Sequence, residues 1–184
     1  MTVSGFQNLR LLDVTSCKLT SWHQVMSFSL LPKLQELIMD SNLIPSVLPC
    51  PATRDSNNEE VEYFPSLQRL SLSCSKLSDW SDINHMASYQ SCRFLRLCQI
   101  PLFAGKGASE VRPMIIGRLP SLVFFNGSGI SMRERTDAEK SYLRSIMFAV
   151  DDAKAAGTVP HCSVLQCVRV ILDRMVDMRE VLGS

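Results

Sequence analysis

The sequence predicts an α/β solenoid in which short parallel strands form a concave face and helices or irregular returns form a convex face. A hydrophobic spacing recurs along the chain, first as LxxLxVxxCxL from Leu9 to Leu19. Two tryptophans, Trp22 and Trp80, follow the turn of their units at the same offset, in the strings LTSW and LSDW. A repeated unit of about 20–29 residues with one strand and one return is typical of a leucine-rich repeat.

Five units can be aligned on this spacing. Their first positions are Leu9, Leu34, Leu67, Cys92 and Leu119, at intervals of 25, 33, 25 and 27 residues. Three of the four intervals fall inside the period of a leucine-rich repeat. In each unit the alternation Leu-x-Leu predicts a short strand with its apolar side chains inward. The next polar residue turns the chain and hydrogen-bonds to free backbone groups, a role that Asn42 fits best, with Cys17 and Ser75 as substitutes.

The segments between the strands differ from unit to unit. Apolar residues at helical spacing predict short helices at residues 22–31 and 80–86. Residues 49–64 are rich in Pro, Asn, Asp and Glu, and we expect them to form a surface loop that lengthens one unit. A second loop is predicted at residues 102–113, where Gly105-Lys106-Gly107 lacks the GxxxxGK[ST] pattern of a phosphate-binding loop.

The array is predicted to end at a capping helix. Ser131 and Glu134 have the spacing of a capping box, in which Ser131 Oγ accepts the amide of the third helical residue. Ala138, Tyr142, Ile146 and Val150 lie near one face of this helix and would close the exposed end of the core, as solenoid caps do.

We therefore expect a leucine-rich repeat domain over residues 1–150, followed by a linker and an amphipathic helix at 151–184. The apolar face of residues 162–182 is expected to dock on the chain's own repeats, and it would cause self-association if it were left uncovered. Because no comparable cap precedes Leu9, we also expect the chain to be part of a longer protein.

Composition argues against several classes of function. The net charge of +1 over 184 residues is unlike that of a nucleic-acid-binding domain. No apolar stretch reaches the ~20 residues that a membrane span needs, and the start of the chain lacks the pattern of a secretory signal. The cysteine count of seven is odd and includes no CxxC pair, which favours reduced thiols in a cytoplasmic protein.

The sequence predicts no catalytic, cofactor-binding or metal-binding residues, and we expect the protein not to be an enzyme. His23, His85 and His161 each stand alone. Their spacing indicates neither a Ser/His/Asp nor a Cys/His set. An enzymatic interpretation would need a cluster of perturbed ionisable groups in a cleft.

The candidate site is instead the outward-facing row of side chains on the strands. Acidic residues dominate this row in the first two units, arginines follow in the next two, and apolar side chains lie among them, as in protein interfaces. The predicted partner-binding residues are Leu11, Asp13, Glu36, Ile38, Asp40, Arg69, Ser71, Phe94 and Arg96. The alternative is that these residues only solvate one face of a sheet.

Three strings resemble the leucine-rich repeat domain of tubulin-binding cofactor E: FQNLRLLDVTSCKLTSWHQV, FPSLQRLSLSCSKLSDWSDIN and IIGRLPSLVFFNGSGISMRERTDAEKSYLR. The last string is similar to the terminal repeat and capping helix of that family, in which an IxxRLxxLxxLN run precedes an ERxxAExxY helix. Here Phe125 stands in place of the last Leu. The resemblance covers roughly Phe6 to Met147.

The resemblance implies a cytoskeleton-associated chaperone that binds α-tubulin during heterodimer assembly or disassembly. The glycine-rich and ubiquitin-like domains of the family are not evident here, and no family function is carried over from Val150 onward. Similar capping motifs occur in phosphatase-regulatory and spliceosomal repeat proteins. The alternative is therefore a cytosolic regulatory or adaptor protein for another partner, such as a phosphatase.

Overall fold

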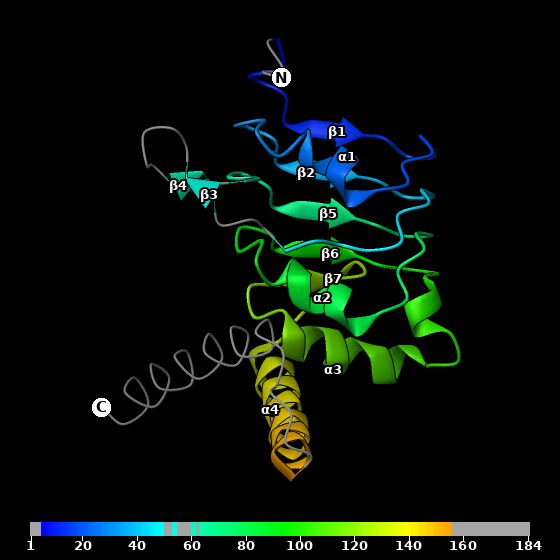
Figure 1. The fold of residues 1–184 in the computed structure, drawn as a ribbon, viewed down its shortest axis with the longest axis vertical. Coiled ribbons are helices and arrows are strands. Elements are labelled where there is room, and N and C mark those ends of the chain that lie inside the picture. The colour runs from blue at the N-terminus through cyan, green and yellow to red at the C-terminus, as the bar shows by residue number, and fades with distance from the viewer. Residues whose placement is uncertain (1–4, 50–52, 55–59, 62, 156–184) are drawn as a thin grey trace.

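A stack of short parallel strands organises the computed structural model, which describes residues 5–49, 53–54, 60–61 and 63–155 (Figure 1). The main sheet has the strand order β1-β2-β5-β6-β7-β8, so each repeat adds its strand beside the previous one. All neighbours are parallel except β7 and β8, which form an antiparallel pair. The strands are β1 (Leu11–Asp13), β2 (Glu36–Ile38), β5 (Arg69–Ser71), β6 (Phe94–Arg96), β7 (Phe124–Phe125) and β8 (Ser128–Gly129).

The strand register confirms the predicted repeat alignment in the first four units. Leu12, Leu37, Leu70, Leu95 and Phe125 lie opposite one another along the sheet. The prediction for the fifth unit was wrong by three residues, because the pairing of Leu95 with Phe125 makes Leu122 the first position. Leu119 is instead the C-cap of the preceding helix, and an apolar residue three positions ahead of Leu122 imitates the repeat spacing.

Each of the strands β1, β2, β5 and β6 is followed by a turn of the same backbone conformation. Ser16, Ser41, Cys74 and Gln99 occupy equivalent positions in their units, and their φ angles lie between 53° and 57°. Residues other than glycine rarely adopt this left-handed conformation. In the first three units the amide of this residue donates to a carbonyl of the next unit, from Ser16 to Asp40, from Ser41 to Ser73 and from Cys74 to Cys98. The turn is therefore a second repeated feature that the hydrophobic spacing alone does not reveal.

Asn42 has the predicted role of joining adjacent repeats. It is fully buried, and its side-chain oxygen accepts a hydrogen bond from the Leu19 amide at 2.9 Å. Its Nδ2 donates to the carbonyls of Val14 and Met39, both at 2.9 Å. One amide side chain thus satisfies backbone groups of two consecutive turns that would otherwise be buried without partners.

Replacing Asn42 with Ala should lower the free energy of unfolding by about 2–3 kcal/mol, because the buried backbone groups of both turns lose their partners. Urea denaturation followed by circular dichroism measures this loss. Asn8→Ala is the matched control, since Asn8 is exposed and its side-chain oxygen accepts from Lys33 Nζ; it should cost at most about 0.5 kcal/mol. Equal losses in the two variants would contradict the role assigned to Asn42.

Both predicted helices on the convex side are present, although the first is shorter than expected. α1 spans Trp22–Met26 and α2 spans Trp80–Met86. Their N-caps are Ser21 and Asp79, whose side chains accept the amides of His23 and Ser81. Trp22 is buried, and its Nε1 donates to the Tyr89 hydroxyl at 2.9 Å, which ties the first repeat to the residues after α2.

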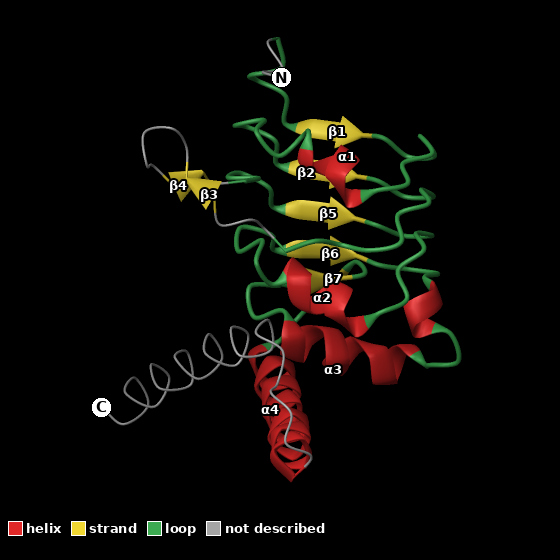
Figure 2. Cartoon of the chain, viewed as in Figure 1, coloured by secondary structure: helices red, strands yellow, loops and turns green. Residues whose placement is uncertain are grey.

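The structure places short regular elements within both predicted loops. In the 49–64 segment, β3 (Thr53–Arg54) and β4 (Glu60–Val61) form an antiparallel pair that stands beside the main sheet (Figure 2). Within residues 102–113, the 3₁₀ helix η1 (Pro101–Phe103) is followed by α3 (Ala108–Arg118). Pro113 lies inside α3 and removes one backbone donor. The helix persists because Val111, Ile115 and Ile116 are buried against the repeats and against α4.

The end of the array is closed by α3 and by α4 (Met132–Ala155), which packs on α3. Half of the predicted capping box is present, since Ser131 Oγ accepts the Glu134 amide at 3.2 Å. The Glu134 carboxylate does not complete the box, because both of its oxygens accept from Arg112. Ala138 and Tyr142 are buried as predicted. The helices approach closely at Gly117, where a Cβ atom would lie 2.8 Å from the Ala138 carbonyl oxygen. α4 continues through residue 150, and the helix predicted at 162–182 lies outside the described residues.

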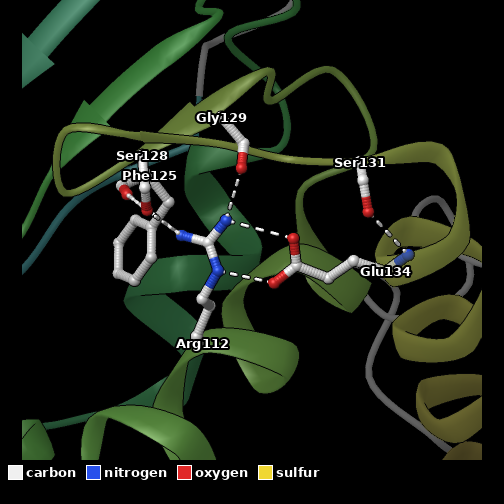
Figure 3. Close-up of polar contacts among 6 residues, drawn as sticks. All are labelled: Arg112, Phe125, Ser128, Gly129, Ser131 and Glu134. Carbon is white, nitrogen blue, oxygen red and sulfur yellow. Dashed lines mark hydrogen bonds and ion pairs between the residues drawn. The ribbon is translucent and has the colours of Figure 1, made fainter.

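The carboxylate of Glu134 joins α4 to Arg112 of α3 (Figure 3). Arg112 Nε and Nη2 donate to the two Glu134 oxygens at 2.5 and 3.1 Å. The remaining donors bind the β7–β8 hairpin: Nη1 donates to the Phe125 carbonyl and Ser128 Oγ, and Nη2 to the Gly129 carbonyl. All five N–H donors of one guanidinium are therefore used to hold α3, the hairpin and α4 together.

Candidate protein-binding surface

The predicted partner-binding side chains lie in two adjacent rows across the parallel strands. Strand pairing aligns the first row as Leu11, Glu36, Arg69, Phe94 and Phe124. It aligns the second row as Asp13, Ile38, Ser71 and Arg96. Asp40 lies two residues beyond Ile38, after the end of β2. We call these two rows together with Asp40 the concave strand surface. The structure thus brings every predicted residue to one face, as the alternation of side chains along a strand requires.

The middle of the first row is a chain of contacts between charged and aromatic groups. Arg69 Nη1 lies 3.4 Å from Glu36 Oε2, and the Arg69 guanidinium lies 4.7 Å from the centre of the Phe94 ring. Phe94 stacks on Phe124 with a centroid separation of 5.0 Å and an interplanar angle of 17°. These contacts orient long side chains that would otherwise be mobile, which reduces the entropy lost when a partner binds.

Asp40 and Ser71 differ from the prediction because they bond to each other, and only Asp40 stays partly exposed. Asp40 Oδ1 accepts hydrogen bonds from Ser71 Oγ at 2.6 Å and from the Ser73 amide at 2.8 Å. Ser71 is buried, with 9% of its surface exposed. This pair joins the turn after β2 to β5, so its main effect is on the shape of the surface.

The two ends of the surface differ in charge and exposure. Leu11 is 50% exposed, and Asp13 is also exposed. Hydrogen bonds from the Thr15 side chain and backbone lower the pKa of Asp13, so this carboxylate is charged at neutral pH. Toward the other end Arg96 is exposed, while Ile38 between them is half-buried. The surface is therefore negative at β1 and positive at β6.

A shallow depression of about 230 Å³ lies on this face and is lined by residues of β2, β5, β6 and β7. Five of its residues were not among the predicted site residues: Leu37, Leu70 and Leu95 are the inward residues of their strands, and Phe124 and Gly127 belong to the fifth unit. Phe124 precedes the inward Phe125 just as Phe94 precedes the inward Leu95. Starting the fifth unit at Leu122 instead of Leu119 would have identified Phe124 from the sequence.

The perturbed ionisable groups on the opposite side of the sheet are structural. Burial raises the pKa of Asp82, and this carboxylate accepts the Val47 amide at 2.8 Å. Burial also raises the pKa of Cys92 to about 12, so its thiol stays protonated and is a poor nucleophile at neutral pH. Among the described residues no cluster of His, Cys, Asp and Glu could hold a metal ion.

The hydropathy of the helices gives one further result. None of those in the described part of the chain combines the length and apolar character needed to span a bilayer.

No protein-family profile matches the chain. It is 30% identical over 138 residues to the tubulin-specific chaperone cofactor E-like protein of Homo sapiens, a match that covers 74% of this chain and 31% of that protein. It is 32% identical over 158 residues to the tubulin-specific chaperone E of Bos taurus, covering 82% of this chain and 28% of that protein. The matched region is thus less than a third of the length of these curated relatives.

Among solved structures, a chain of the Drosophila melanogaster SNF/U2A′ complex matches with a TM-score of 0.56 at 16% identity. The match covers 73% of this chain and 68% of that chain. U2A′ is a leucine-rich repeat protein, so the structural match confirms the predicted leucine-rich repeat solenoid.

Proposed function

Because the chain is homologous, over about three quarters of its length, to the tubulin-specific chaperone E and cofactor E-like proteins, we propose that it is a tubulin-folding cofactor. We further propose that it is a non-enzymatic, cytoplasmic scaffold that binds α-tubulin through the concave strand surface. The binding would hold the subunit during assembly or disassembly of the tubulin heterodimer.

The observation that carries this proposal is the charged and aromatic row from Glu36 to Phe124, displayed on the repeats of a capped solenoid. Protein interfaces are enriched in arginine and aromatic side chains, which supply much of the binding free energy. A row in which Arg69 is already held between Glu36 and Phe94 is organised before a partner arrives. The arrangement supports noncovalent binding of a protein.

Charge reversal on this surface should weaken retention of α-tubulin. We expect the double variant Arg69→Glu/Arg96→Glu to bind at least about tenfold more weakly, because loss of a charge-assisted contact at an interface costs roughly 1.4 kcal/mol or more. Pull-down of purified α-tubulin by the immobilised chain, quantified over a concentration series, measures the change.

Lys76→Glu/Lys106→Glu is the matched control, because it changes the net charge equally at two exposed residues off the strand rows. The single variant Arg96→Glu is measured as well, since Arg69→Glu also introduces repulsion with Glu36. Circular dichroism establishes that each variant is folded. Undiminished retention by the folded double variant would rule out the concave strand surface as the binding site.

A further inference from the structure

The charges of the concave strand surface are not equally available to a partner. Glu36 is paired with Arg69, and Asp40 is occupied by Ser71 and Ser73. Arg96 is exposed and, within the described part of the chain, has no ion pair or hydrogen bond from its side chain. Of the two arginines on this surface, Arg96 is therefore the one whose guanidinium has no partner within the described part of the chain.

An aromatic platform lies next to this cation. Phe94 precedes Arg96 by two residues on the same strand, so both side chains leave the sheet on the same face. Phe124 stacks on Phe94 from the neighbouring strand and keeps 39% of its surface exposed. All three residues line the same depression of about 230 Å³. We call Phe94, Arg96 and Phe124 the aromatic–arginine patch.

The spacing within the patch fits an extended peptide. Residues two apart on a strand are separated by about 6.5–7 Å, and this is the separation of Phe94 and Arg96 along β6. Residues i and i+2 of an extended partner have the same separation and also share one face. When an apolar side chain of the partner lies on Phe94 and Phe124, the partner's side chain two positions away would therefore lie over Arg96.

From this match we infer that the aromatic–arginine patch binds an extended acidic segment of a protein partner, in which an apolar residue and a carboxylate lie two positions apart. A carboxylate is the group that a guanidinium binds most strongly, through charge-assisted hydrogen bonds. This inference rests on the proposed function in that it assigns the partner chemistry of the same surface. It also gives the two ends of that surface opposite preferences, because Asp13 at β1 is anionic.

The probes are synthetic nine-residue peptides with central Leu-Ser-Glu, Leu-Ser-Lys, Leu-Glu-Ser or Ala-Ser-Glu. Titration of the isotope-labelled full chain by NMR detects even millimolar binding at the amides of residues 94–96 and at the Arg96 side chain. We expect the Leu-Ser-Glu peptide to bind at least about tenfold more tightly than the Lys version. The adjacent Leu-Glu-Ser arrangement and the Ala version should both bind more weakly, because one side chain then leaves the patch.

Two variants separate charge from packing. Arg96→Glu should reverse the preference, so that the Leu-Ser-Lys peptide binds more tightly than the Glu version, whereas Lys106→Glu should leave the preference unchanged. Phe124→Ala should weaken every Leu-containing peptide and leave the Glu-over-Lys preference in place. A reversed preference in Arg96→Glu also shows that this variant is folded, since a collapsed surface would bind neither peptide.

The inference is overturned if no peptide shifts the 94–96 amides, if spacing and charge make no difference, or if Arg96→Glu keeps the original preference. Its failure can be told apart from failure of the proposed function, because α-tubulin retention is measured separately. Retention of α-tubulin without peptide binding would refute only the inference that the aromatic–arginine patch binds an acidic segment. Peptide binding without retention of α-tubulin would instead remove α-tubulin as the partner.

Discussion

Arg135→Met should lower the free energy of unfolding by about 3–5 kcal/mol, the loss typical when one partner of a buried ion pair is removed. Arg135 is 9% exposed, and its Nη1 donates to the carbonyls of Ile116 and Leu119 at 3.4 and 3.3 Å. Its Nη2 donates to the Leu122 carbonyl. These carbonyls belong to the end of α3 and the start of the last repeat, so one side chain of α4 holds the cap on the array.

The expected loss is large because the substitution also removes the positive charge beside Glu139. The Glu139 carboxylate is 1% exposed, and its Oε1 lies 3.3 Å from Arg135 Nη1. A buried carboxylate next to an apolar side chain carries a desolvation penalty that the ion pair offsets. Urea denaturation followed by circular dichroism gives the difference in the free energy of unfolding.

Two further variants test this explanation. Arg133→Met changes an exposed arginine of the same helix and should cost at most about 0.5 kcal/mol. Arg135→Met/Glu139→Leu should recover part of the loss, because an apolar pair of similar volume often replaces a buried ion pair at little cost. If Arg135→Met costs no more than Arg133→Met, the buried pair does not hold the cap.

The strand array could be predicted because its determinants are local and repeated. Each strand is specified by inward residues such as Leu37 and Met39, and the same spacing occurs again in later units, so a single misread residue changes little. The concave position of Glu36, Arg69 and Phe94 follows directly from that alternation. Asn42 could be assigned its hydrogen-bonding role because its position after the strand is also set by the repeat spacing.

The last repeat and its cap depend on contacts that spacing does not encode. Arg112 binds Glu134, which is 22 residues away in the sequence, and nothing in the string SEVRP indicates that contact. Residues 102–113 were predicted to form a loop, although burial of Ile115 and Ile116 maintains a helix from Ala108 onward. The ERxxAExxY resemblance did contain the relevant residues, since it includes Glu134, Arg135, Ala138, Glu139 and Tyr142. The resemblance did not explain why these residues occur there. The structure does, because they form the junction between α4 and α3.

The site shows the same division between local and distant determinants. The rows of the concave strand surface follow from local alternation, but which charges remain available depends on pairing across strands. The alternation of side chains predicts an outward-facing Asp40, but its carboxylate accepts a hydrogen bond from Ser71 of the next repeat. Arg69 and Arg96 are both outward-facing arginines in the sequence, one in each row. Among the described residues, only Arg69 of the two has a carboxylate, that of Glu36, within ion-pair distance. Pairing of this kind has to be measured in three dimensions.

Arg112→Met should cost about 2–4 kcal/mol at neutral pH, since it breaks charge-assisted hydrogen bonds to α4 and to the β7–β8 hairpin at once. Hydrogen bonding to Arg112 is the main cause that lowers the pKa of Glu134. A carboxyl whose pKa is lowered by folding adds stability above its unfolded pKa of about 4.3 and loses that stability as the pH falls through the folded value.

The difference in the free energy of unfolding between wild type and Arg112→Met should therefore be largest at neutral pH and become smaller below about pH 4. Urea denaturation at several pH values from 3 to 7 measures it, with Arg144→Met, at an exposed position of α4, as the control variant. In Glu134→Gln the free energy of unfolding should likewise lose the pH dependence that Glu134 causes, although the Gln side chain keeps one acceptor for Arg112. A difference between wild type and Arg112→Met that stays constant across this range would mean that the guanidinium stabilises the junction through the hairpin carbonyls alone, and that its pairing with Glu134 contributes nothing.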